Sequence, residues 1–285
     1  MNLDEIKTIG VIGAGTMGHG IAQVCALSGY QVVLVDVDQG LLDQAVANIT
    51  ASVDKLHAKN RITDEQFAAA QTNITPSLAL SDVSDAQIVI EAATENKAIK
   101  LDIFKQLDTL TAPETILATN TSSIPITEIG AVTNRPAQVI GMHFMNPVPI
   151  MKLIEVIRGL VTSQATTDTV IALAEQLGKT PVEAADFPGF IANRILIPMI
   201  NEAIFALMEG VGTAEAIDTV LKLGANHPMG PLALADLIGL DVVLSIMEVL
   251  YAGFGDPKYR ACPLLRQMVA AGHLGRKSGQ GFYSY

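Results

Sequence analysis

The sequence predicts an α/β fold, with a doubly wound and mostly parallel sheet followed by an all-α C-terminal domain. Short apolar runs alternate with segments of helical periodicity through about the first two thirds of the 285 residues. A glycine-rich turn joins the first apolar run to the first helical segment. Beyond a Phe-Pro-Gly stretch at residues 187–189, apolar residues recur only at helical spacing.

The first elements form a strand, a turn, a helix and a second strand. Thr8 to Ile12 is a short apolar run, and the glycine-rich turn at 13–18 follows it directly. A helical pattern then runs from His19 to Leu27 and ends at Ser28-Gly29. Residues 31–36 are rich in β-branched side chains and show no polar alternation, which is typical of a parallel strand covered on both faces.

The same alternation continues along the chain. Residues 41–56 predict a long helix, and Thr63-Asp64-Glu65-Gln66 has the capping-box spacing that begins another helix at Thr63. Apolar runs and periodic segments predict strands at 88–91, 116–119, 139–144 and 152–158, with helices over 97–110 and around 168–177.

The second part of the chain predicts helices only, at 191–208, 214–223 and 232–250. The length is about twice that of a typical domain. We therefore expect two domains, residues 1–186 and 187–285, with the boundary at the Phe-Pro-Gly stretch.

Composition excludes several classes of function. Lys and Arg number 18 against 29 Asp and Glu, and the formal charge of −11 has the wrong sign for broad contact with nucleic acid or anionic lipid. Cys25 and Cys262 are too few and too far apart for a disulfide framework or a metal site of the CxxC type. We expect no bound metal, no nucleic-acid partner and a reducing compartment.

Membrane insertion and export are not expected either. The most apolar long stretch, residues 233–254, carries three carboxylates, each of which is costly inside a bilayer. The first seven residues lack the apolar core of a signal peptide. We expect a cytoplasmic bacterial protein.

The glycine-rich turn predicts a dinucleotide site. Gly13, Gly15 and Gly18 lie between a strand and a helix, where they permit a tight turn, approach of a pyrophosphate and close helix packing. Asp36 ends the second strand, where a carboxylate can accept hydrogen bonds from ribose hydroxyls. It would repel a 2'-phosphate, and no Arg or Lys occurs at 37–40, so the expected cofactor is NAD rather than NADP.

His143 is a candidate acid or base. It lies at the carboxyl end of a predicted strand, where open α/β sheets bind their ligands. Glu155, on the next strand, can accept a hydrogen bond from one ring nitrogen and favour the imidazolium form. A histidine beside Phe144 is equally consistent with a packed core residue, and the residues alone leave both interpretations open.

Three further features have two interpretations each. The polar cluster at 119–123 fits a turn or helix cap as well as a substrate contact. Asn193 fits a helix cap or a solvated position. Lys55, Lys59 and Arg61 outnumber Asp54 in the segment 51–61, which predicts either a solvated helix end or an anion site.

Taken together, the motifs resemble those of the L-3-hydroxyacyl-CoA dehydrogenases, and most closely the short bacterial enzymes that act on 3-hydroxybutyryl-CoA. The resemblance covers nearly the whole length. It rests on the stretches Gly13-Ala14-Gly15-Thr16-Met17-Gly18, Glu91-Ala92-Ala93-Thr94-Glu95-Asn96, Thr119-Asn120-Thr121-Ser122-Ser123, Gly141 to Pro149, Pro188 to Arg194, His227-Pro228-Met229-Gly230-Pro231 and Gly275 to Tyr283.

The resemblance implies a Rossmann-type domain and reversible, NAD-dependent oxidation of the 3-hydroxyl of an acyl-CoA. It implies His143 and Glu155 as the catalytic pair, with Ser122 and Asn193 touching the substrate. The cofactor-binding residues that it implies are Gly13, Gly15, Thr16, Met17, Gly18, Asp36, Glu95, Lys100 and Asn120. Substrate contacts are expected from Ser52, Lys55, Lys59, Ser122 and Asn193.

The helical domain of the family binds substrate and forms a homodimer, so the resemblance implies both for residues 187–285. Two other functions are weighed against it. One is a Rossmann hydroxyacid dehydrogenase of another class, such as a 6-phosphogluconate-type enzyme. The other is a redox-silent relative that only binds NAD.

Overall fold

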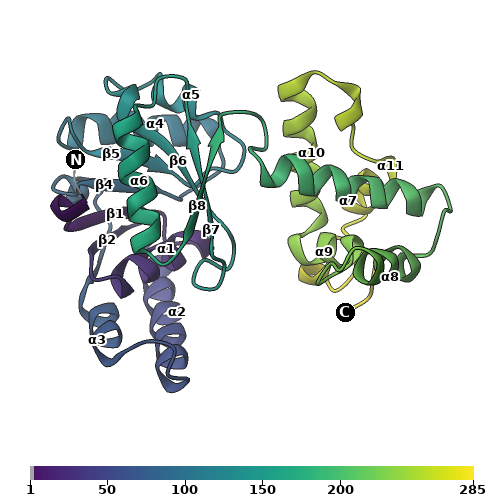
Figure 1. Cartoon of the computed structure of the whole chain (residues 1–285), viewed down its shortest axis with the longest axis horizontal. Coiled ribbons are helices and arrows are strands. Elements are labelled where there is room, and N and C mark those ends of the chain that lie inside the picture. The colour runs from purple at the N-terminus through teal and green to yellow at the C-terminus, as the bar shows by residue number, and fades with distance from the viewer. Residues whose placement is uncertain (1–2) are drawn as a thin grey trace. The chain divides into compact units, whose positions relative to one another are not determined.

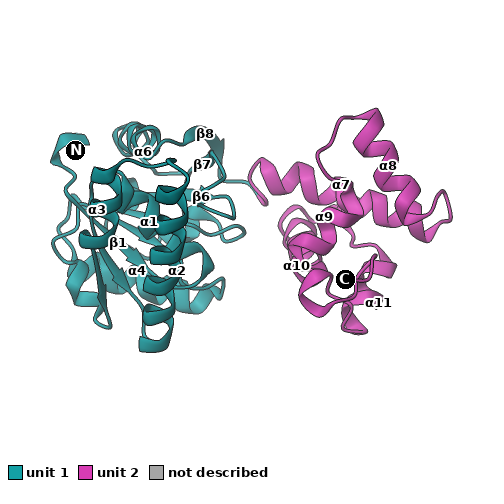
Figure 2. Cartoon of the chain, turned by 90° about the horizontal axis from the view of Figure 1, so that it is seen from below, with its two compact units in different colours: residues 1–187 teal, residues 188–285 magenta. Residues whose placement is uncertain are grey.

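The computed structural model describes residues 3–285, and the chain divides into two compact units, Met1–Phe187 and Pro188–Tyr285 (Figure 2). The division lies one residue beyond the domain boundary expected at 186/187. The first seven residues are expected to lack the apolar core of a signal peptide. Of these, residues 1–2 lie outside the described residues. Among residues 3–285, no helix combines the length and apolar character needed to cross a membrane.

The first unit is built on one eight-stranded sheet of order β3-β2-β1-β4-β5-β6-β7-β8. All neighbouring strands are parallel except β6 and β7, so the expectation of a mostly parallel sheet is confirmed. The strands are β1 (Thr8–Ile12), β2 (Gln31–Val35), β3 (Ile74–Ser77), β4 (Ile88–Glu91), β5 (Ile116–Thr119), β6 (Val139–Phe144), β7 (Leu153–Arg158) and β8 (Thr180–Ala185).

Sequence patterns missed the two edge strands, β3 and β8. Both are largely exposed or half-buried, and each contains a proline, so neither forms the continuous apolar run that predicts a buried parallel strand. The six strands between them match the predicted segments to within one residue at each end.

Helices cover both faces of this sheet (Figure 1). They are α1 (Thr16–Leu27), α2 (Gln39–Ala58), α3 (Asp64–Thr72), α4 (Lys97–Leu110), α5 (Ile126–Gly130) and α6 (Gln164–Gln176). The capping box predicted at Thr63 is confirmed, because its hydroxyl accepts from the Gln66 N–H at 3.2 Å and Gln66 Oε1 accepts from the Thr63 N–H at 3.1 Å.

Helices α1 and α5 show what local patterns did not predict. Helix α1 begins three residues before the expected start, because Gly15 serves as its N-cap and places two glycines within the helix. Helix α5 is short, and its first N–H groups are bound by the carboxylate of Asp186, 60 residues away in the chain. A partner so distant leaves no periodic pattern in the local sequence.

The second unit is helical and has a core of its own, formed by residues such as Ile200, Ile204, Leu232, Val243 and Met247. Its helices are α7 (Ala192–Met208), α8 (Ala214–Gly224), α9 (Pro231–Ile238), α10 (Leu240–Phe254) and α11 (Pro263–Ala270). Single turns of 3-10 helix occur at Leu3–Glu5, Leu80–Val83, Pro136–Gln138, Pro257–Tyr259 and Arg276–Ser278.

The single helix expected over 232–250 is wrong. The backbone at Gly239 has φ of +104°, which no helix accommodates, so α9 ends there and α10 begins at the next residue. Helix α11 was not expected, since its eight residues are too few for a clear periodic pattern.

Candidate active site

The glycine-rich turn between β1 and α1 has space for glycine only at positions 13 and 18. A Cβ at Gly13, where φ is +98°, would lie 2.5 Å from the Cα of Ala93, and a Cβ at Gly18 would lie 1.7 Å from the carbonyl oxygen of Gly13. At Gly15, by contrast, an added Cβ would meet open space among the described residues. The N-terminus of α1 is therefore accessible to an anionic group, and this geometry fits the pyrophosphate of a dinucleotide.

Asp36 directly follows β2 and is half-buried beside this turn. Its Oδ2 accepts a hydrogen bond from the Ala14 N–H at 2.7 Å, which ties the carboxylate to the turn. Thr16 and Met17 form the first turn of α1, and Thr16 is exposed. The turn and the acid that the sequence analysis paired are thus together in the structure, as dinucleotide binding requires.

The register of two antiparallel strands brings His143 and Glu155 together. They are direct partners across β6 and β7, so their side chains project from the same face of the sheet. The Nδ1 of His143 lies 2.9 Å from Oε2 of Glu155. His143 is 6% exposed and Glu155 only 1%, so the carboxylate holds the ring in a site with little water.

Ser122 faces the other nitrogen of the same ring. Its Oγ is 3.1 Å from Nε2 of His143. The loop that carries it follows β5, and Asn120 in this loop accepts the Phe144 N–H at 2.8 Å through Oδ1. Ser122, His143 and Glu155 therefore form one line of hydrogen-bonding groups at the carboxyl ends of β5 and β6.

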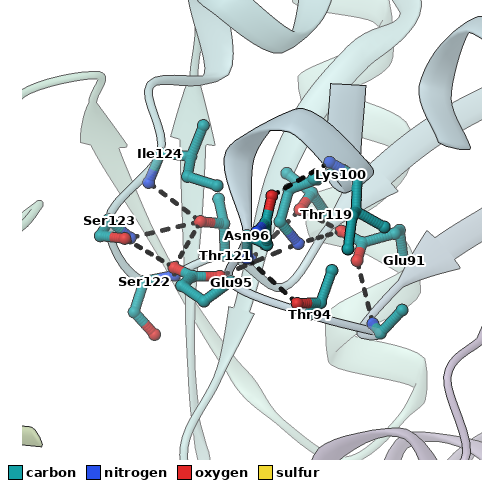
Figure 3. A network of polar contacts seen from close by, with 12 residues as sticks. Glu91, Thr94, Glu95, Asn96, Lys100, Thr119, Thr121, Ser122, Ser123 and Ile124 are labelled. Atoms are coloured by element: carbon teal, nitrogen blue, oxygen red, sulfur yellow. Dashed lines mark hydrogen bonds and ion pairs between the residues drawn. The ribbon is translucent and has the colours of Figure 1, made fainter. Parts of the chain in front are cut away.

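A second polar network, drawn in Figure 3, organises the loop around Ser122. Oε1 of Glu95 accepts from Thr121 Oγ1 at 2.7 Å, from the Ser122 N–H at 2.8 Å and from Ser123 Oγ at 2.8 Å. Lys100 is 1% exposed and forms an ion pair with the buried carboxylate of Glu91.

Glu91 is not among the site residues that the sequence predicts. One signal was available, because Glu91 is a carboxylate directly after three apolar residues at the carboxyl end of a strand. A second signal lay in α4, where the spacing of Lys100, Phe104 and Leu107 places the lysine on the buried face of the helix.

The remaining predicted residues lie on other elements. Ser52 and Lys55 lie three residues apart on one face of α2, Lys59 is the C-cap of this helix, and both lysines are exposed. Asn193 is the second residue of α7, in the second unit, and is half-buried there. The roles expected for these four residues stay predictions.

The two cysteines are buried, and burial raises the pKa of the Cys25 thiol to about 12. This side chain is therefore a protonated core residue rather than a nucleophile. Across residues 3–285, no cluster of three or more His, Cys, Asp or Glu side chains has an arrangement suited to a metal ion.

Comparison with known proteins identifies the family. The family model for the NAD-binding domain of 3-hydroxyacyl-CoA dehydrogenase matches residues 8–187, and the model for the C-terminal domain of the same family matches residues 189–285. The first family model identifies the dinucleotide as NAD.

Individual relatives match over almost their whole length. A probable 3-hydroxybutyryl-CoA dehydrogenase of Bacillus subtilis is 58% identical over 99% of this chain and 98% of its own. A 3-hydroxybutyryl-CoA dehydrogenase of Bradyrhizobium diazoefficiens is 52% identical over 98% of this chain and 96% of its own. The crystal structure of an (S)-3-hydroxybutyryl-CoA dehydrogenase from Ralstonia eutropha has a TM-score of 0.96 and 53% identity, with 99% of both chains covered.

Both family models, these identities and the fold lead to one conclusion. The chain belongs to the 3-hydroxyacyl-CoA dehydrogenase family and is an NAD-dependent dehydrogenase.

Proposed function

We propose that this enzyme interconverts 3-hydroxybutyryl-CoA and acetoacetyl-CoA, with His143 and Glu155 as its acid/base pair. The observation that carries the proposal is the line of half-buried Ser122 and buried His143 and Glu155, with contacts of 3.1 and 2.9 Å. The substrate is inferred from relatives whose names specify 3-hydroxybutyryl-CoA.

In the oxidation direction, His143 accepts the proton of the 3-hydroxyl group through Nε2. Glu155 holds Nδ1 and stabilises the positive charge that develops on the ring. Ser122, next to Nε2, donates to or accepts from the same substrate oxygen and orients it. The glycine-rich turn and Asp36 would hold NAD, which would supply the acceptor for the hydride of C3. In the reverse direction His143 returns the proton to the carbonyl oxygen.

We also propose that residues 187–285 bind the acyl-CoA, that Asn193 orients it, and that this unit forms a homodimer. An apolar hollow of about 480 Å³ lies between α7 and α8. Its presence supports the proposal that this unit binds an apolar partner. Near it, Val211, Val220 and Leu223 are 76%, 64% and 80% exposed, as expected of residues that a second chain covers. Sedimentation should then give twice the chain mass of 30.1 kDa.

A cytoplasmic location stays a prediction.

The test of the acid/base pair follows NADH absorbance with acetoacetyl-CoA as substrate. His143→Gln should lower kcat by at least about 100-fold and leave the affinity for NADH unchanged, because it removes the proton donor only. His273→Gln, at an exposed position of the second unit, is the matched control and should behave as wild type. Near-normal turnover by His143→Gln would contradict the assignment.

Glu155→Gln should cost less than His143→Gln. Without the carboxylate, Nδ1 loses the partner that orients the ring and stabilises the charge formed on it during proton transfer. The value of kcat for acetoacetyl-CoA should therefore fall with the NADH affinity unchanged, and a kcat equal to that of wild type would show that Glu155 does not act through the ring. Failure of the wild type to reduce acetoacetyl-CoA would favour a redox-silent protein or another hydroxyacid substrate.

A further inference from the structure

The inference concerns Lys179, a buried lysine that the proposed mechanism does not use. Lys179 lies between α6 and β8 and is 9% exposed. Its Nζ donates to the carbonyl oxygen of Val148 and, at 2.8 Å, to the carbonyl oxygen of Met151. Both acceptors belong to residues 145–152, the β6–β7 loop, which joins β6 to β7.

The backbone around Lys179 is fixed on both sides. Its own N–H donates to the carbonyl oxygen of Ala174 in the last turn of α6, at 3.0 Å. The next residue, Thr180, donates its N–H to the carbonyl oxygen of Lys152 at 2.7 Å. Hydrogen bonds from a charged donor are strong where little water competes. Lys179 therefore ties the middle and the end of the β6–β7 loop to a rigid part of the fold.

The β6–β7 loop has one further close contact, with α1. The side chain of Val148 is 2% exposed, and a Cβ at Gly20 would lie 2.9 Å from the Cβ of Val148, so loop and helix pack tightly there. Ile150 and Met151, by contrast, are 73% and 41% exposed. Their side chains add little packing, which leaves the carbonyl contacts of Lys179 a large part in ordering the loop.

This order matters because the turn itself does not align the two strands. Hairpin turns that fix strand register span about two to five residues, whereas the β6–β7 loop has eight. Both strands are buried along nearly their whole length, so no alternation of polar and apolar residues selects the register. His143 lies two residues before this loop, and Glu155 lies three residues beyond it.

We propose that Lys179 is a positioning residue, which fixes the β6–β7 loop and thereby holds Glu155 opposite His143. The proposal rests on the proposed function for the roles of these two residues. Its chain of contacts runs from Lys179 Nζ to the two loop carbonyls, along the backbone into β7, and from Glu155 Oε2 to His143 Nδ1. The assignment uses two of the three N–H donors of the ammonium.

The test removes these donors. Lys179→Met keeps a side chain of similar length but leaves both loop carbonyls without their donor. We expect kcat for acetoacetyl-CoA to fall by about tenfold, because small displacements of a catalytic group are costly. The dissociation constant of NADH and the KM for acetoacetyl-CoA should stay within about threefold of wild type. In a Glu155→Gln background, the same change should lower kcat by less than about twofold, because the positioned carboxylate is already absent.

Two further variants separate the hydrogen bonds from the charge. Lys179→Arg retains N–H donors for both carbonyls and should keep kcat within about threefold of wild type. Lys105→Met removes the same charge from an exposed position of α4 and should leave kcat and NADH affinity unchanged. An equal loss of kcat in Lys179→Arg and Lys179→Met would contradict a role for the donated hydrogen bonds.

A readout independent of turnover separates this proposal from the proposed function. In protein labelled with ¹⁵N at histidine, the Nδ1 resonance of His143 reports its contact with Glu155. It should move in Lys179→Met in the direction seen in Glu155→Gln, and stay in place in Lys105→Met. This expectation holds whether or not acetoacetyl-CoA is the substrate.

Three other results would overturn the proposal. A rise in the NADH dissociation constant or in KM that matches the loss in kcat would make Lys179 a ligand contact. An unchanged kcat and an unmoved His143 resonance would leave Lys179 a purely structural role. An equal loss in the Glu155→Gln background would show that Lys179 does not act through Glu155. If Lys179→Met fails to fold, Lys179→Gln, which keeps an amide donor of shorter reach, is subjected to the same measurements.

Discussion

At the scale of single residues, we expect Asp36 to serve two groups at once. Its carboxylate accepts from the Ala14 N–H of the glycine-rich turn, and we expect it to accept from the cofactor ribose as well. Asp36→Ala should therefore weaken NAD binding and raise the affinity for NADP relative to NAD, because repulsion of the 2'-phosphate is removed. Titration of both cofactors by fluorescence measures the ratio.

Asp36→Asn separates the two effects. The amide keeps an acceptor oxygen for Ala14 but loses the negative charge, so this variant should retain more NAD affinity than Asp36→Ala while still improving NADP. A wild-type preference for NADP would contradict the role assigned to Asp36.

At the scale of elements, the C-terminal end of α2 presents the basic patch formed by Lys55, Lys59 and Arg61. His57 fixes this end, since its Nε2 lies 2.7 Å from Oδ1 of Asp64 and its ring stacks on Phe67 at 4.3 Å. The lysines are exposed on a helix whose end is anchored to α3.

We expect this patch to contact the phosphates of CoA. Lys55→Ala with Lys59→Ala should raise KM for acetoacetyl-CoA about tenfold, since each exposed contact contributes roughly 1 kcal/mol or less, and high salt should reduce the effect. Acetoacetyl-pantetheine, which lacks the nucleotide phosphates, should show no change. Lys7→Ala with Lys105→Ala removes equal charge from exposed positions elsewhere and is the control. Equal losses on both substrates would refute the phosphate contact.

The C-terminal end of α4 depends on a different carboxylate. Asp108 accepts the Asn134 N–H at 2.9 Å and Arg135 Nε at 2.9 Å. Burial by itself would raise the pKa of Asp108, but these hydrogen bonds and the Arg135 charge outweigh it and hold the pKa below the ordinary 3.8. These contacts of the Asp108 carboxylate stabilise the folded protein. Their contribution is complete above pH 3.8 and is lost as the pH falls through the folded-state pKa of Asp108.

Asp108→Asn should therefore lower the free energy of unfolding at pH 7 by about 1–3 kcal/mol. The difference from wild type should shrink as the pH falls below 3.8. Urea unfolding at pH 7 and near pH 3 measures both. Asp102→Asn, at an exposed position of the same helix, should show no such dependence, and a pH-independent deficit in Asp108→Asn would contradict the assigned pKa.

At the scale of the whole molecule, each unit has its own core, and residues 281–285 complete the core of the second. Asp236 is 1% exposed and accepts the Phe282 and Tyr283 N–H groups, each at 3.0 Å. The Tyr283 hydroxyl donates to Asp218 at 2.9 Å, and burial together with this carboxylate raises the pKa of Tyr283. The Gly275 to Tyr283 motif thus has a structural role, because it satisfies two buried carboxylates.

Deletion of residues 281–285 should destabilise the second unit by more than about 2 kcal/mol, since Asp236 would lose its backbone donors. Calorimetry measures the unfolding temperature of the second unit, and NADH titration measures the cofactor affinity of the first unit. We expect a lower unfolding temperature with an unchanged NADH affinity. Tyr285→Phe removes a single hydrogen bond, from the hydroxyl to Asp236 at 3.1 Å, and should have a much smaller effect. A parallel loss of NADH affinity would mean that the two units do not fold independently.

The sequence by itself determined the buried strands, most helix positions and the cofactor-binding turn. These features depend on local rules: apolar runs mark covered strands, periodicity marks helices, and glycines mark turns where a Cβ does not fit. The same rules placed His143 and Glu155 on neighbouring strands, although they left open whether His143 was a core residue.

Only the tertiary structure decided the contacts that join distant segments. The antiparallel register sets His143 opposite Glu155, Asp186 caps α5 from 60 residues away, and Glu91 pairs with Lys100 inside the fold. Local patterns cannot report such contacts, because the energy of a buried charge depends on which partner the fold brings within hydrogen-bonding distance. The edge strands β3 and β8 were also decided by the tertiary structure, because pairing with a neighbouring strand, and not local hydrophobicity, makes them strands.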